Sequence, residues 1–317
     1  MVEVGVIEVD DKRYPALLKE ALGKLMPSLG PKRLYYKGNW DSLFSAKGGS
    51  AAGGENCLSV VGSRRLTHYG ATATQQLAGQ VAAAGVTIVS GFMYGGDKAA
   101  HQAALSCGGR TIAVMPCGIN LVHPAGQEKL YQDIIDKGGL IISEYEGAAQ
   151  PQTFTYVQRD RLVAGLSKAV LVTEASLKSG SLITASYAKK FGRKIFALPG
   201  QITSDVAKGT IALIRQGAEA VLEAQDILTF FNVVHASSDK VFSGEFGASR
   251  SQGAQKYSVA AGSDLERKIF DQLKNESMKA DDMARLFAVP VAQVGTALSL
   301  MEMRGVVSQN AGIYYLA

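Results

Sequence analysis

Short runs of Val, Ile and Leu recur along the chain between about residues 58 and 228, and segments with helical spacing of apolar residues separate them. Continuous apolar runs of this length are typical of strands buried on both faces of a parallel sheet. The runs are Leu58–Val61, Val86–Ser90, Thr111–Met115, Leu140–Ser143, Ala169–Thr173 and Ile195–Leu198. The helical segments are Tyr69–Ala84, Lys98–Ser106, Gln127–Lys137 and Leu182–Phe191. Strand and helix alternate, which predicts an α/β fold with a doubly wound, mostly parallel sheet.

A different pattern follows residue 262. Three apolar stripes at helical spacing precede two short strand-like runs around Asn310-Ala-Gly312, and three helices followed by a hairpin are typical of a winged helix. The stretch between the two patterns is dominated by Ser, Gly, Ala and charged residues, so we expect a flexible linker. The predicted domains are therefore 1–234, the linker 235–262 and the winged helix 263–317. Ser45–Asn56 is also Gly-rich and is expected to be flexible.

Composition excludes several classes of protein. No stretch reaches the roughly 18 unbroken apolar residues of a membrane span, and the first residues lack a basic region followed by an apolar one, so we expect a cytoplasmic protein. Cys57, Cys107 and Cys117 show no metal-ligand spacing and are expected to be packing residues. We expect neither a metal nor a cofactor.

The formal charge of +5 is unevenly divided. Residues 263–317 contain six Lys and Arg against seven Asp and Glu, a net charge of −1, so the first 262 residues carry +6. If the protein binds a polyanion, the larger domain is the better candidate for the contact.

Gly62-Ser63-Arg64-Arg65 stands where a buried strand ends and a helix is about to begin. The start of a helix presents backbone N–H groups and a positive dipole end, which suit an anion. Two arginines favour the same sign of ligand, and phosphate is the first candidate.

Ser90-Gly91 opens a second junction of this kind, followed by a glycine cluster that ends in Gly95-Gly96-Asp97. Glycine clusters often satisfy tight turns only, so this signal is weak by itself. The carboxyl ends of parallel strands share one edge, however, and that edge is where ligands bind in such sheets. His101, inside the following helix, is more typical of a packing histidine than of a base or ligand.

Two further stretches carry cations. Tyr156, Arg159 and Arg161 lie within six residues, with Asp160 between the arginines; such a group is either a solvated ion-pair face or an aromatic platform with cations that holds a single nucleic-acid strand. Lys178-Ser179-Gly180-Ser181 runs from a strand end into a helix. Its serines could serve only as a helix N-cap, but this is the third anion-friendly junction at the same edge.

These pieces, in this order, resemble the DprA/Smf family of bacterial DNA-processing proteins over about residues 14–228. The matching motifs are Gly62-Ser63-Arg64, Ser90-Gly91 through Asp97 with His101–Leu105, Arg159-Asp160-Arg161 with Ala164–Ser167, Ser179–Ala185, Pro199-Gly200 and Gly209-Thr210. The winged helix resembles an accessory domain of that family, whereas we expect no counterpart of the helical N-terminal domain of many members.

The resemblance implies an extended Rossmann-like domain that binds single-stranded DNA, forms a homodimer and delivers the RecA recombinase onto the strand during natural transformation, without catalysis. It also implies roles for individual residues: Arg64 and Lys178 on phosphate, Tyr156 stacked on a base, and Arg159 and Arg161 from the family's Arg-Asn-Arg motif.

The chain departs from the family pattern at positions that bear on the ligand. Gly96 replaces Ile, Asp160 replaces Asn, Tyr156-Val157 replaces Phe-Pro, and Ile211 stands where the family has Asn. A carboxylate at position 160 disfavours a neighbouring phosphate unless an arginine neutralises it.

Two other functions stay open on the sequence. One is a LOG-like phosphoribohydrolase, although Pro199-Gly200 and Gly209-Thr210 do not reproduce the motif of those enzymes and no base with an orienting partner is evident. The other is a nucleotide-sensing module, in which the same sheet edge would hold one small nucleotide.

Overall fold

The structure is a computed structural model that describes residues 3–25, 30–44, 56–233, 263–274, 276–310 and 312–316. The predicted linker 235–262 and almost all of the Gly-rich stretch 45–56 lie outside the described residues. The chain divides into two compact units, Met1–Asp239 and Lys240–Ala317, and each is described by itself.

The larger unit is built on one sheet, whose strands follow the order β1-β2-β6-β5-β4-β3-β7-β8-β9 in its described part. All pairs from β6 to β9 are parallel, whereas β1 with β2 and β2 with β6 are antiparallel. The strands are β1 (Gly5–Glu8), β2 (Arg33–Gly38), β3 (Cys57–Val61), β4 (Thr87–Ser90), β5 (Thr111–Gly118), β6 (Leu140–Tyr145), β7 (Ala169–Val172), β8 (Lys194–Ala197) and β9 (Glu219–Ala220).

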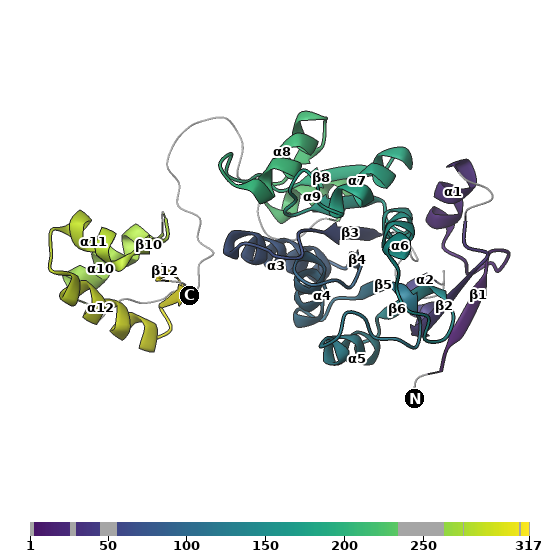
Figure 1. Cartoon of the computed structure of the whole chain (residues 1–317), viewed down its shortest axis with the longest axis horizontal. Helices are drawn as coiled ribbons and strands as arrows, with labels where there is room; N and C mark the ends of the chain where they lie inside the picture. The colour runs from purple at the N-terminus through teal and green to yellow at the C-terminus, as the bar shows by residue number, and fades with distance from the viewer. Residues whose placement is uncertain are drawn as a thin grey trace. The chain divides into compact units, whose positions relative to one another are not determined.

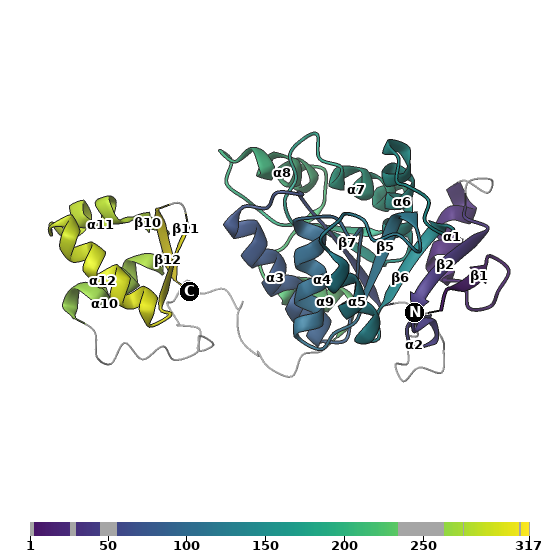
Figure 2. The same cartoon turned by 60° about the horizontal axis from the view of Figure 1, so that its bottom comes forward.

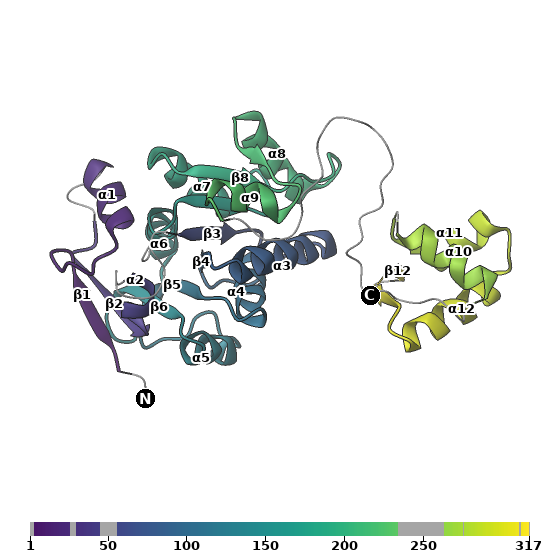
Figure 3. The same ribbon diagram turned by 180° about the vertical axis from the view of Figure 1, so that it is seen from behind.

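Helices cover both faces of this sheet, as Figures 1 and 3 show for α3 and α4 on one side of the strands and α6 on the other. The helices are α1 (Ala16–Leu25), α2 (Trp40–Phe44), α3 (His68–Ala83), α4 (Gly96–Ser106), α5 (Glu128–Asp136), α6 (Thr153–Gly165), α7 (Ser181–Lys190), α8 (Lys208–Arg215) and α9 (Ala224–Phe230). The predicted doubly wound, mostly parallel fold is confirmed.

The central strands are buried on both faces because their side chains alternate between two helical layers. In β3, Leu58 and Val60 pack with the layer that contains α3 and α4, while Cys57 and Val61 pack with the layer of α1, α6 and α7. This explains why the sequence shows continuous apolar runs rather than an alternating pattern.

The order of the strands reverses beside β3. The chain moves outward from β3 through β4, β5 and β6, and then returns to the other side of β3 with β7, β8 and β9. The loops after β3 and β7 therefore diverge at a switch point, where open α/β sheets hold their ligands. Two of the anion-friendly junctions, at Gly62 and before Ser181, follow these two strands.

Some elements carry too little signal to be found in the sequence. In β1 only Ile7 is fully buried, and β1 and β2 add an antiparallel extension to the sheet (Figure 2). The stretch with Tyr156 and the two arginines forms the helix α6, whose polar residues hide the period because several of them face inward.

The smaller unit has the predicted winged-helix elements. Its helices are α10 (Asp264–Leu273), α11 (Ala280–Phe287) and α12 (Val291–Met303), and β11 (Val307–Asn310) pairs with β12 (Ile313–Leu316). A two-residue strand, β10 (Met278–Lys279), completes the sheet. Ile269, Met283, Val294 and Leu298 lie at the centre of its core.

Within the described residues, no single helix is long and apolar enough to cross a membrane. The pair α11 and α12 reaches the required length and composition only together, across a bend of 119°.

Candidate nucleic-acid interface

The loop after β3 is held by the turn that precedes α4. The backbone N–H of Gly96 donates to the carbonyl of Ser63 at 3.0 Å. Gly95 has a φ of +71°, and a Cβ at this position would lie 2.2 Å from the Ser63 oxygen. Only glycine fits such a backbone and such an approach. The glycine cluster therefore does serve a turn, and that turn fixes the backbone that leads to Arg64.

The loop after β7 is tied to the same place. The Glu174 carboxylate accepts the N–H of Thr67 at 2.9 Å and its hydroxyl at 2.5 Å, and Thr67 in turn caps α3 through Gly70. Thr173 is buried next to Gly62, and its hydroxyl forms no hydrogen bond with any described residue. The two loops of the switch point thus form one connected structure.

Arg64 is exposed, and its guanidinium lies over the ring of Tyr156 at 5.5 Å from the ring centroid. This is a cation–π distance. The Tyr156 hydroxyl lies 2.7 Å from Nε2 of His123, which belongs to the loop after β5. Three segments far apart in sequence therefore bring a cation, an aromatic ring and an imidazole together at the sheet edge.

Arg159 lies on the inner face of α6 and is only 4% exposed. Its guanidinium donates to the carbonyls of Gly91 and Val114 and to the Asp160 carboxylate at 3.1 Å. Burial raises the pKa of Asp160 to about 6, since it outweighs the attraction of Arg159. Burial also raises the pKa of Asp97, another carboxyl beside Arg159.

Arg161 is 7% exposed, and its guanidinium donates to the Glu144 carboxylate at 2.6 Å. Both arginines of this motif therefore differ from the expectation that they follow the phosphates of a strand. The reason is the helix: α6 turns positions 159 and 161 toward the protein, where carbonyl and carboxylate oxygens take their donors. The alternative that these arginines form a solvated ion-pair face is wrong for the same reason, because both are buried.

Ser90 and Gly91 are also buried. The Ser90 hydroxyl donates to the carbonyl of Val60 at 2.6 Å, and the Gly91 carbonyl accepts from Arg159. The Ser90 hydroxyl and the Gly91 carbonyl thus bind other parts of the protein. They support the edge of the sheet and do not face a ligand as the sequence led us to expect.

The segment before α7 differs from these. Lys178 is exposed, and the hydroxyls of Ser179 and Ser181 lie 2.8 Å apart. The N-cap residue of α7 is Gly180, and no side chain caps this helix start. The N-terminus of α4, with Gly95 as N-cap, likewise has no side-chain cap. The start of α7 retains the positive end that suits an anion, whereas at α4 the Gly96 N–H is already bonded to the Ser63 carbonyl and Asp97 stands in the first turn.

His101 is a packing residue, as the sequence indicates. It is fully buried, its Nδ1 lies 2.7 Å from the Thr111 hydroxyl, and burial lowers its pKa to about 3. Cys57 and Cys117 are buried as expected, but the expectation is wrong for Cys107, which is exposed at the end of α4.

His123 and Tyr94 also lie at this edge, although no sequence motif singled them out. Tyr94 is 45% exposed and donates its hydroxyl to the carbonyl of Ala125 at 2.7 Å. The sequence offered one signal for His123, which is that it follows a predicted strand, β5, by a few residues. Within the described residues no group of three His, Cys, Asp or Glu side chains could hold a metal ion.

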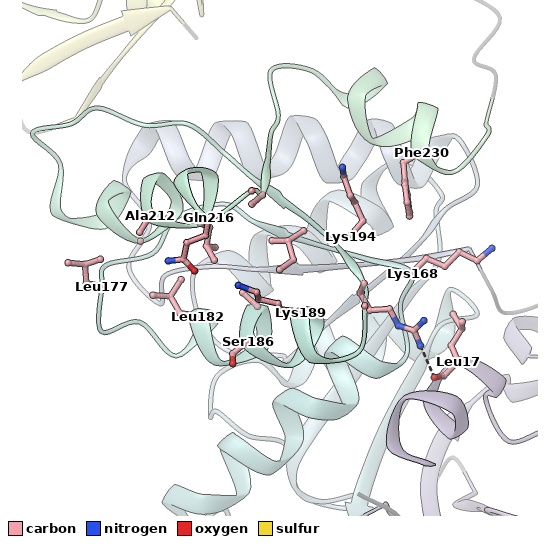
Figure 4. A pocket seen from close by; sticks show the side chains of 18 residues that line it. Leu17, Lys168, Leu177, Leu182, Ser186, Lys189, Lys194, Ala212, Gln216 and Phe230 are labelled. Atoms are coloured by element: carbon pink, nitrogen blue, oxygen red, sulfur yellow. Dashed lines mark hydrogen bonds between the residues drawn. The ribbon is translucent and has the colours of Figure 1, made fainter. Parts of the chain in front are cut away.

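A hollow of about 1140 Å³ lies between α7, α8 and β8 (Figure 4). Apolar side chains line it, among them Leu177, which is 62% exposed, and Phe230. Lys168, Lys189 and Lys194 stand around these apolar groups.

Comparison with known proteins matches this chain to two family models. Residues 5–232 match DNA recombination-mediator protein A, and residues 254–312 match the DprA winged helix domain. The chain is 33% identical to protein Smf of Synechocystis sp. over 96% of its own length and 78% of that protein. It is 38% identical to protein Smf of Escherichia coli over 70% of its own length, but only 55% of that protein is covered.

Among solved structures, the chain is similar to DNA processing protein A from Helicobacter pylori, which was reported for its unique single-stranded DNA binding mode. The TM-score is 0.62 at 30% identity, over 73% of this chain and 96% of the other.

Proposed function

The chain belongs to the DNA recombination-mediator protein A family, and from this premise we propose that it binds single-stranded DNA along the edge formed by the loops after β3, β5 and β7. Arg64 and Lys178 contact phosphates, Tyr156 stacks on a base, and the start of α7 with Ser179, Gly180 and Ser181 receives a further phosphate. Ser63 and Gly62 hold the backbone on which Arg64 stands. Arg159 and Arg161 support α6 from within.

One observation carries the proposal. An exposed arginine over an aromatic ring, at the switch point of the sheet, is the combination by which proteins hold single strands: cations follow the phosphates and bases stack on rings. The ring and the cation come from segments 92 positions apart, and the fold brings them into contact.

Equilibrium binding to three ligands tests this proposal. Fluorescence anisotropy would compare a labelled single strand of about 20 nucleotides with the matching duplex and with a single labelled mononucleotide. We expect the single strand to bind most tightly, because a base in a duplex is not free to stack on Tyr156. Tight binding of the mononucleotide, with no gain from longer strands, would favour the nucleotide-sensing alternative instead.

We also propose that the larger unit forms a homodimer through the hollow between α7 and α8. Its exposed Leu177 and Phe230 give it an apolar surface, and such surfaces mark protein contacts. Ala212→Arg places a charge in this hollow. The variant should elute as a monomer in size-exclusion chromatography with light scattering, whereas an unchanged dimer would contradict this face.

Delivery of the RecA recombinase is the third part of the proposal, and membership in a family of recombination mediators supports it. The protein should shorten the lag of RecA assembly on a strand that is already covered by single-strand-binding protein. A lag unaffected by the protein would contradict this role.

A further inference from the structure

His123 holds no place in the proposed site so far, yet it contacts the ring that we assign to base stacking. Its Nε2 lies 2.7 Å from the Tyr156 hydroxyl, and the two rings meet edge-on at a centroid distance of 6.0 Å. The structure shows what that hydroxyl does: it joins α6 to the loop after β5.

Tyr156 makes a second contact, the cation–π contact with Arg64. Arg64 lies over the Tyr156 ring, so the position of this ring also decides where the guanidinium rests. A tyrosine side chain rotates about two torsions, and a hydrogen bond at its far end restricts both. His123 is therefore the group that can fix ring and cation together.

We propose that His123 is a positioning residue for strand binding, which holds Tyr156 and, through it, Arg64 in the orientation that a base and its phosphate require. This inference rests on the proposed function. It adds a residue that touches neither the base nor the phosphate.

The charge state of the imidazole fits this role. Burial and the neighbouring Arg64 both lower the pKa of His123, so the ring is neutral at pH 7. A neutral imidazole with its proton on Nδ1 accepts at Nε2 a hydrogen bond that the Tyr156 hydroxyl donates. A charged imidazole would instead repel Arg64.

A double-mutant cycle with single-strand affinity as the readout tests the proposal. His123→Leu and Tyr156→Phe each remove the same hydrogen bond from one side. Each should weaken binding about 3- to 10-fold, the range of one hydrogen bond, and the double variant should be no weaker than either single one. Losses that multiply in the double variant would overturn the proposal, and so would unchanged affinity in Tyr156→Phe, which keeps the ring and the imidazole.

Two controls separate positioning from general damage. His123→Gln places an amide near the position of Nε2 and should restore most of the affinity; a loss as large as with Leu would contradict the hydrogen bond. Tyr94→Phe also removes a tyrosine hydroxyl bonded to the same loop, at Ala125, and its effect should add independently to that of His123→Leu. If the parental protein binds no strand at all, the proposed function fails and not only this inference.

Discussion

At the residue scale, similar side chains have different roles according to their burial. Arg64 and Lys178 are exposed at the sheet edge. Arg159 and Arg161 carry the same charge, but their guanidinium groups donate hydrogen bonds to carbonyl and carboxylate oxygens inside the protein. A buried guanidinium must satisfy its donors within the fold. The sequence identifies the cations, but only the orientation of α6 decides which of them a phosphate can reach.

Asp160 provides a prediction about pH. Its pKa is raised to about 6 by burial, so the folded protein favours the protonated acid. Ionisation of Asp160 therefore lowers the free energy of unfolding. This loss is absent at low pH and grows as pH rises from about 4 through 6. Asp160→Asn should therefore raise the melting temperature at pH 7.5 by a few degrees and leave it nearly unchanged at pH 4.

The same substitution removes a negative charge near Arg64. Strand affinity should rise roughly two- to fivefold at pH 7.5, and the difference from the parental protein should disappear at pH 5, where the parental acid is protonated. Thermal melts and anisotropy across this range provide the measurement. A variant that is less stable at pH 7.5 would show that the carboxylate is needed to hold Arg159.

At the element scale, the strands and helices of the central sheet follow from their apolar runs, and the predicted and observed bounds agree within a few residues. Signals were weak where an element is short or faces two environments, as in β1, β9 and α6. The contacts between loops were not readable at all, because Thr67 with Glu174 and Tyr156 with His123 are each brought together by tertiary structure.

The turn before α4 allows a matched test of an element's position. Gly95 and Gly108 both have a φ of +71°, but an added Cβ meets Ser63 and Arg64 backbone atoms at position 95 and nothing within 4 Å at position 108. Both Ala variants carry backbone strain because φ is positive, on the order of 1–3 kcal/mol each. Only Gly95→Ala should also displace the Arg64 loop and lower strand affinity, by about tenfold or more. Equal strand affinity of the two variants would show that the turn at Gly95 does not position the strand site.

At the scale of the whole molecule, charge distinguishes the two units. The helix α12 carries neither Lys nor Arg between Val291 and Met303, and Arg304 at its end is paired with the buried Glu266. Winged helices that read DNA place such a helix in the major groove and rely on cations around it. The distribution of charge, readable from sequence, therefore supports our proposal that strand binding lies in the larger unit.

Removal of residues 263–317 tests this division. Single-strand affinity should fall less than about threefold, because the deleted part carries a net charge of −1 and offers few cations to phosphates. Anisotropy at the same salt concentration for the full chain and the shortened chain gives the comparison. A loss of tenfold or more would mean that the winged helix takes part in binding.

The most direct test of the central claim is the salt dependence of strand affinity in Arg64→Ala and Lys178→Ala. If each cation contacts a phosphate, each variant should weaken binding to every strand sequence and flatten the slope of log K against log salt by about 0.7. Lys190→Ala is the matched control, because Lys190 is an exposed cation at the opposite end of α7. Parental affinity and slope in both site variants, or an equal change in Lys190→Ala, would contradict a phosphate path at this edge of the sheet.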